Sequence, residues 1–104
     1  MGVIADSPSG GSLMDLRYHL DPDTDLPHIY GHGVTEAEVE FVLRHPGEDR
    51  AGREGPRHTL GQTASGRYLH VIYVPDEEGD GIFVVTAYDL GGKPLQAYRR
   101  RGRR

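Results

Sequence analysis

The sequence predicts an α+β fold in which an N-terminal helical layer packs on a three- to four-stranded antiparallel sheet. Three observations lead to this fold class. A well-capped amphipathic helix is predicted over residues 36–45, a hairpin follows over 60–74, and another strand-like run covers 82–88. The second strand of the hairpin, 67–74, and the run 82–88 are both rich in β-branched and aromatic residues. Because they are apolar on both alternating faces, we expect them to be central strands covered on both sides.

The composition predicts one small domain with loose ends. The chain has 104 residues, 36% of them hydrophobic, with 15 Gly, 7 Pro and no Cys. No apolar run approaches the roughly 20 residues that span a membrane, and the start of the chain lacks the pattern of a signal peptide. We therefore expect a cytoplasmic protein that does not interact with membranes. Residues 1–12 are expected to form a disordered tail, 13–98 a single α+β domain and 99–104 a basic C-terminal tail.

The first elements are predicted to be short. Residues 13–20 fit an edge strand, and a turn cluster follows at 21–25. Thr24 or Asp25 is predicted to cap a short helix through 28–30, and Gly31 and Gly33 end it.

The next helix has the strongest local signals. Thr35 and Glu38 form a capping box, in which Thr35 is the N-cap and Glu38 reaches back from the third helical position. Val34 and Val39 occupy the positions of a hydrophobic staple. The helix is predicted from about Glu36 to His45.

The remaining segments are expected to alternate between loops and strands. The charged, Gly-rich stretch 47–56 is predicted to be a loop, 57–63 the first strand of the hairpin, and 75–81 an acidic connection between the two central strands. Residues 95–98 form either a last strand or a short helix.

Charge is distributed unevenly over a chain whose net charge is −4. Residues 1–50 carry 10 acidic and 3 basic side chains, whereas residues 51–104 carry 6 acidic and 9 basic ones. This asymmetry predicts an anionic partner near the C-terminal half. The alternative is a solvated basic tail without a partner.

Several motifs together resemble one known family. They are His-Gly-Val-Thr at 32–35 before the acidic amphipathic helix, Gly-Gln-Thr-Ala-Ser-Gly-Arg at 61–67 before an apolar strand, Val-Ile-Tyr at 71–73, and Val-Val-Thr-Ala-Tyr at 84–88. The arrangement, roughly from Leu16 to Tyr98, resembles the BrnT-type toxins of bacterial type II toxin–antitoxin systems, which share the RelE-like ribonuclease fold.

The resemblance implies a substrate, a partner and two site positions. The substrate is messenger RNA, and the partner is a cognate antitoxin protein. The hairpin arginine of the family corresponds to Arg67. The arginine that closes the last central strand in an S-A-R motif corresponds to Tyr88, so this chain departs from the family there.

Cleavage of RNA by 2′-OH attack requires a base, a group that stabilises charge on phosphorus and an acid for the leaving oxygen. RelE-like enzymes meet these needs without a metal, so the expected activity is that of a metal-independent endoribonuclease. The candidate catalytic residues are Arg67, Tyr88 and His58, with His70 as an alternative acid or base. The candidate nucleic-acid-binding residues are Arg53, Arg57, Arg99, Arg100 and Arg101. The structural alternative is that Arg67 is a surface residue at a strand entry and Tyr88 a core aromatic.

No metal or cofactor is expected. His28 and His32 have helical i, i+4 spacing, but no third ligand follows at a clear distance. The acidic residues 76–80 lack the ligand pattern of an EF-hand loop and are predicted to form a solvated turn.

Two alternatives to a toxin-type ribonuclease stay open. The departure at Tyr88 favours a catalytically inactive member of the same fold that binds nucleic acid or protein. The third alternative is a protein-binding domain that pairs through an exposed sheet edge, as a homodimer.

Overall fold

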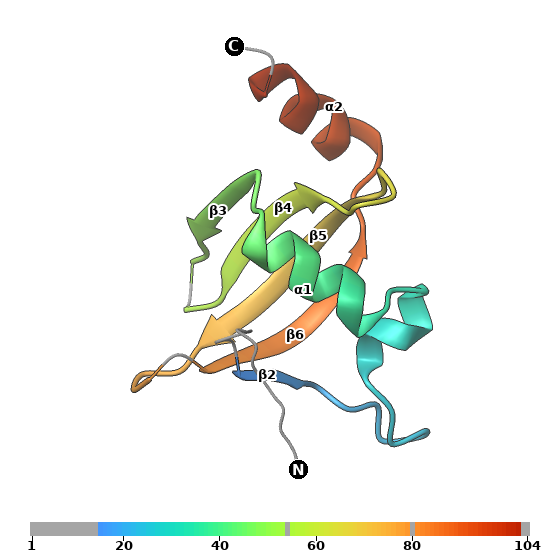
Figure 1. The fold of residues 1–104 in the computed structure, drawn as a ribbon, viewed down its shortest axis with the longest axis vertical. Coiled ribbons are helices and arrows are strands. Elements are labelled where there is room, and N and C mark those ends of the chain that lie inside the picture. Colours follow the sequence, from blue (N-terminus) through green and yellow to red (C-terminus); the bar gives the residue numbers. More distant parts are fainter. Residues whose placement is uncertain (1–14, 54, 80, 103–104) are drawn as a thin grey trace.

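A computed structural model describes residues 15–53, 55–79 and 81–102 of the chain. The described elements, in chain order, are the strand β2 (Asp15–Tyr18), the 3₁₀-helix η1 (His28–His32), the helix α1 (Glu36–Arg44), the strands β3 (Glu48–Ala51), β4 (Arg57–Gln62), β5 (Tyr68–Pro75) and β6 (Gly81–Asp89), and the helix α2 (Gly92–Arg101). The predicted α+β class is confirmed (Figure 1). The tail expected over residues 1–12 lies outside the described residues.

The sheet has five strands in the order β2-β6-β5-β4-β3. The neighbouring pairs from β3 to β6 are antiparallel, but β2 runs parallel to β6. Four strands are antiparallel as expected, but the sheet has a fifth strand and is mixed, because β2 departs from the expected orientation. The edge strand predicted within 13–20 is confirmed as β2.

The fifth strand lies where a loop was predicted. β3 occupies part of the stretch 47–56 and pairs with β4, with Asp49 opposite Thr59. Asp49 accepts hydrogen bonds from the hydroxyls of Thr59 and Tyr73, and Glu48 pairs with Arg101 of α2. These long-range contacts stabilise a polar strand whose own residues have little β-propensity.

The helix α1 forms as predicted, one residue shorter. The Thr35 hydroxyl accepts a hydrogen bond from the Glu38 amide, and the Glu38 carboxylate accepts one from the Thr35 amide. Val34 and Val39 are both buried, which confirms the positions of the staple.

The 3₁₀-helix η1 has a different start from the one predicted. Pro27 is its N-cap and no side chain caps it, whereas the Thr24 hydroxyl accepts a hydrogen bond from the Leu26 amide. Gly33, with a positive φ of 72°, ends η1 as expected, whereas Gly31, which was also expected to end it, lies within it.

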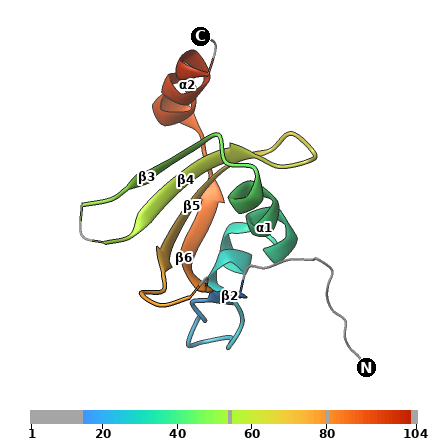
Figure 2. The same cartoon turned by 60° about the vertical axis from the view of Figure 1, so that its left-hand side comes forward.

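The core lies between the sheet and the layer formed by α1 and η1. Figure 2 shows both on the same side of the sheet. Leu69, Val71 and Tyr73 of β5 face this layer and are buried, while the alternating Tyr68, His70 and Ile72 are only half-buried. The opposite face, called here the open face, carries α2 only at one end, because a single short helix cannot cover five strands. The expectation that both faces are covered was therefore wrong.

The helix α2 settles the alternatives for 95–98 in favour of a helix. It continues through Arg101, so Arg99, Arg100 and Arg101 lie in its last turn rather than in a tail. Within the described part of the chain, no helix is both long and apolar enough to cross a membrane.

Candidate functional site

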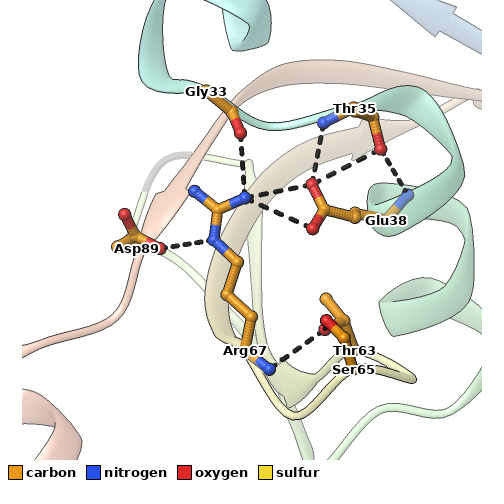
Figure 3. Close-up of polar contacts among 7 residues, drawn as sticks. All are labelled: Gly33, Thr35, Glu38, Thr63, Ser65, Arg67 and Asp89. Atoms are coloured by element: carbon orange, nitrogen blue, oxygen red, sulfur yellow. Dashed lines mark hydrogen bonds and ion pairs between the residues drawn. The ribbon is translucent and has the colours of Figure 1, made fainter.

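Arg67 lies at the end of the β4–β5 hairpin and is held by three partners. Its Nε donates to Asp89 over 2.6 Å, and its Nη1 donates to the Gly33 carbonyl over 2.8 Å and to Glu38 over 3.1 Å (Figure 3). Its backbone amide donates to the Thr63 hydroxyl within the hairpin turn. The guanidinium therefore ties the hairpin to the start of α1 and to the end of β6.

The ionisation of this cluster follows from its contacts. The hydrogen bond to Asp89 is the main cause that raises the pKa of Arg67. The pKa of Glu38 is lowered, first by the hydrogen bond from the Thr35 backbone, and that of Asp89 is lowered by Arg67. All three groups are charged at neutral pH, so Arg67 is neutralised on the α1 side of the sheet.

The other two predicted catalytic residues lie on the open face and are linked to each other through His70. Nδ1 of His58 lies 2.9 Å from Nε2 of His70, and Nδ1 of His70 lies 3.2 Å from the Tyr88 hydroxyl. The strand register explains this chain: His70 is directly opposite Tyr88 on β6 and one diagonal step from His58 on β4. The structure therefore brings His58 and Tyr88 together and places Arg67 apart from them.

The chain of three side chains has two complete hydrogen-bonding arrangements. A neutral imidazole has one N–H and one acceptor nitrogen. If His58 donates to His70 and His70 donates to Tyr88, the His58 Nε2 is an outward acceptor and the Tyr88 O–H an outward donor. In the reverse arrangement, His58 presents an N–H and Tyr88 presents an acceptor oxygen. The chain can therefore take up a proton at one end and release one at the other.

The surroundings of His70 keep it in the neutral form that this exchange needs. Burial, the neighbouring His58 and then Arg50 lower the pKa of His70. A protonated imidazole has two donors and no acceptor. The half-buried position of His70 therefore preserves the hydrogen bonds from His58 through His70 to Tyr88 at neutral pH.

A cavity of about 160 Å³ lies beside His70, between α2 and the open face. Two of the side chains that line it are cationic: Arg50 of β3, which is exposed, and Arg101 of α2, which also binds both oxygens of Glu48. The other lining residues are Leu60, Leu90, Pro94 and Ala97. Because Glu48 neutralises Arg101, Arg50 is the cation that this cavity offers to a phosphate group beside the imidazole.

The remaining arginines predicted to bind nucleic acid are dispersed. Arg57 pairs with Asp49, and this hydrogen bond is the main cause that raises the pKa of Arg57. Arg53 and Arg100 are exposed. Arg99 lies over the Tyr68 ring, 5.9 Å from its centroid, on a hollow of about 270 Å³ near the end of α2. Only Arg101 of this set borders the cavity beside His70.

Sequence reasoning missed Arg50. It lies within Glu-Asp-Arg, a stretch predicted to be a loop, and its position opposite His58 appears only once β3 is known to pair with β4. His28 and His32, considered for a metal, lie with their rings 5.0 Å apart. No group of three or more metal-ligating side chains is assembled in residues 15–53, 55–79 and 81–102.

Comparisons of the chain with models of protein families, with curated proteins and with solved structures give no match in any of the three.

Proposed function

We propose that this protein cleaves RNA without a metal ion, by attack of the ribose 2′-OH on the adjacent phosphorus, with messenger RNA in the cytoplasm as the substrate. The observation that carries the proposal is the His58–His70–Tyr88 chain on the open face. It supplies an acceptor and a donor at its two ends, beside a cavity that Arg50 borders.

The reaction uses both ends of the chain. The His58 Nε2 takes the proton of the 2′-OH, and the 2′-oxygen forms a bond to phosphorus as the bond from phosphorus to the 5′-oxygen breaks. The Tyr88 hydroxyl gives its proton to the leaving 5′-oxygen. The protons within the chain shift from His58 to His70 and from His70 to Tyr88, which leaves a 2′,3′-cyclic phosphate, a 5′-hydroxyl and a neutral protein.

The departure at Tyr88 fits this chemistry. The resembled toxins have an arginine at this position, whereas here Tyr88 acts as the acid. Arg50 supplies the cation from the neighbouring part of the open face and stabilises the charge that develops on the phosphate oxygens. An antitoxin would neutralise the protein by covering the open face.

A cleavage assay with a labelled RNA tests the proposal. The wild-type protein is expected to cut it in the presence of EDTA and to leave a cyclic phosphate end. His58→Ala and Tyr88→Phe are expected to lower the rate by about 10²- to 10⁴-fold, the usual contribution of a general acid or base. His45→Ala is the matched control, because His45 stacks on Phe41 of α1, away from the open face. Equal rates for wild type and both site variants would contradict the mechanism.

A non-catalytic binding module is the competing function. The observation that favours it is the pairing of Arg67, the family arginine that this chain retains, with Glu38 and Asp89. Salt-sensitive RNA binding without any cleavage would support this second function and reject the first.

A further inference from the structure

The helix α2 crosses one end of the open face without filling the space beneath it (Figure 1). Pro94, Ala97 and Arg101 have i, i+3, i+7 spacing, so they lie on one side of the helix, and all three line the cavity beside His70. None of the three is a large apolar residue, and no residue of α2, which the structure describes in full, is buried. The side of α2 that is turned to the sheet therefore leaves the cavity of about 160 Å³ open.

Contacts at the edge of the sheet hold α2 in this position. The Tyr98 hydroxyl packs so closely on Gly47 that a Cβ there would overlap it, and Arg101 binds Glu48. Gly47 precedes β3 and Glu48 is its first residue, so both contacts fix α2 to the same edge. Because Arg101 and Glu48 form a neutral pair, they bring no net charge to the cavity.

The lining of the cavity suits an uncharged group. Four of its side chains are apolar, and they come from both the sheet side and α2: Leu60, Leu90, Pro94 and Ala97. A phosphate placed among these side chains would lose its hydration without gaining partners in exchange. An uncharged ring would instead remove apolar surface from water, as ligands do in most binding pockets.

The size of the cavity selects a single ring. An apolar cavity of about 150 Å³ takes up one benzene molecule, and this one has a volume of about 160 Å³. A pyrimidine base is one six-membered ring, whereas a purine base carries a second, fused ring. The cavity therefore accommodates a pyrimidine and is too small for a purine.

The cavity lies where a base of the proposed substrate reaches it. Leu60 is directly opposite His70 and lies two residues beyond His58 on β4, so all three side chains are on the open face. Arg50 is exposed at the rim of the cavity and lies opposite His58 on β3. A nucleotide whose phosphate lies beside Arg50 and whose ribose lies at His58 thus has its base next to the cavity.

We propose that this cavity, called here the base pocket, binds the pyrimidine base of the nucleotide whose 2′-OH attacks. The protein then cuts RNA after uridine and cytidine rather than after adenosine and guanosine. The bound base fixes its own ribose at His58, which orients the 2′-OH for attack. The inference names the preferred substrate of the proposed cleavage and rests on that function for the position of the scissile phosphate.

Binding of nucleoside 3′-monophosphates to the wild-type protein, measured by isothermal titration calorimetry, tests the base pocket apart from cleavage. These compounds carry the base, the ribose and the 3′-phosphate but no bond for the protein to cut. The monophosphates of cytidine and uridine are expected to bind at least about tenfold more tightly than those of adenosine and guanosine, a discrimination within the range of an apolar pocket. Equal affinities for all four would overturn the proposal.

Ala97→Leu places a larger side chain in the base pocket. It is expected to weaken the binding of cytidine 3′-monophosphate about tenfold and to leave that of adenosine 3′-monophosphate unchanged. Ala37→Leu is the matched control, because Ala37 is an exposed helical alanine of α1, on the other side of the sheet. If Ala97→Leu folds, as thermal unfolding shows, and keeps the wild-type preference, the cavity is a packing gap and not a base pocket. If it does not fold, the comparison of the four ligands on the wild type decides.

The ends of the cleavage products separate this inference from the proposed reaction. Products that end in the cyclic phosphates of uridine and cytidine would support both. Cleavage that shows no preference for the base would keep the reaction and reject the base pocket. Selective binding of pyrimidine monophosphates, lost in Ala97→Leu, by a protein that cuts no RNA would keep the base pocket and reject the reaction.

Discussion

Oδ1 of Asp89, the last residue of β6, lies 2.6 Å from Nε of Arg67, which directly precedes β5. This contact closes the end of the antiparallel pair of central strands. The same guanidinium donates to the Gly33 carbonyl and to Glu38, so one side chain joins the start of α1 to this end of the sheet.

Arg67→Ala is expected to lower the free energy of unfolding by about 1–3 kcal/mol, because it leaves Asp89 and Glu38 without their cation. Urea denaturation measures the loss. Arg44→Ala is the matched control, since Arg44 forms an exposed i, i+4 pair with Glu40 whose loss costs about 0.5 kcal/mol or less. Equal effects of the two substitutions would show that the Arg67 contacts contribute no more than a surface pair.

Tyr73→Phe is expected to destabilise the protein by about 1–2 kcal/mol at neutral pH and by much less in acid. Burial alone would raise the pKa of Asp49, but hydrogen bonds from Thr59, Tyr73 and Arg57 outweigh it and lower the pKa. As pH falls, Asp49 therefore takes up its proton in the unfolded chain before it does so in the folded protein. The stabilisation that ionised Asp49 gives the fold is present above about pH 4 and is lost as pH falls through its lower pKa in the folded state. Urea denaturation of both proteins from neutral pH to about pH 3 tests this. If the difference in free energy of unfolding between wild type and Tyr73→Phe did not change with pH, the hydrogen bond from Tyr73 to ionised Asp49 would not be the source of the stabilisation.

The rate of RNA cleavage is expected to fall in acid, with a midpoint below about pH 6.5, the ordinary imidazole value. The reason is that burial, His58 and Arg50 lower the pKa of His70, and protonation of His70 removes the acceptor that the chain needs. A pH–rate profile with a short RNA measures the midpoint. Arg50→Ala removes one of the causes and should move the midpoint upward. A midpoint unaffected by this substitution would argue that His70 does not control the acid limb.

Arg50 is expected to neutralise one RNA phosphate and so to contribute to the salt dependence of RNA binding. For single strands, log K falls with log salt concentration with a slope of about −0.7 per neutralised phosphate. Arg50→Ala should therefore reduce the magnitude of the slope by about 0.7, as measured by anisotropy over a series of salt concentrations. Arg44→Ala, on α1, should leave the slope unchanged. A slope that is the same for Arg50→Ala and wild type would remove Arg50 from the phosphate contacts.

The parts of the fold that the sequence predicts well depend on local signals. The capping box of Thr35 and Glu38 and the buried staple valines place α1 to within one residue, and the β-branched runs place β5 and β6. β3 has no such signal. It exists because Asp49 and Glu48 find partners on β4, β5 and α2, which no local pattern reveals.

The candidate site was predictable in its residue types but not in its connections. His58 was singled out because imidazole titrates near neutrality, and Tyr88 because it takes the position of the family arginine, yet they lie on strands that do not neighbour each other. Their link through His70 depends on the register of β4, β5 and β6. The contact between the His32 and Tyr88 rings depends further on the position of η1, which follows from packing rather than from spacing in the sequence.

The pairing of β2 with β6 has a consequence for the order in which the protein matures. Asp15 pairs with Gly81, about 66 residues later in the chain. At a synthesis rate of about 5–20 residues per second, several seconds pass before the ribosome supplies the partner of β2. His19 and Phe83 come together only in that last step. A nascent chain therefore emerges with β2 unpaired, and the five-stranded sheet is completed only after most of the chain has been synthesised.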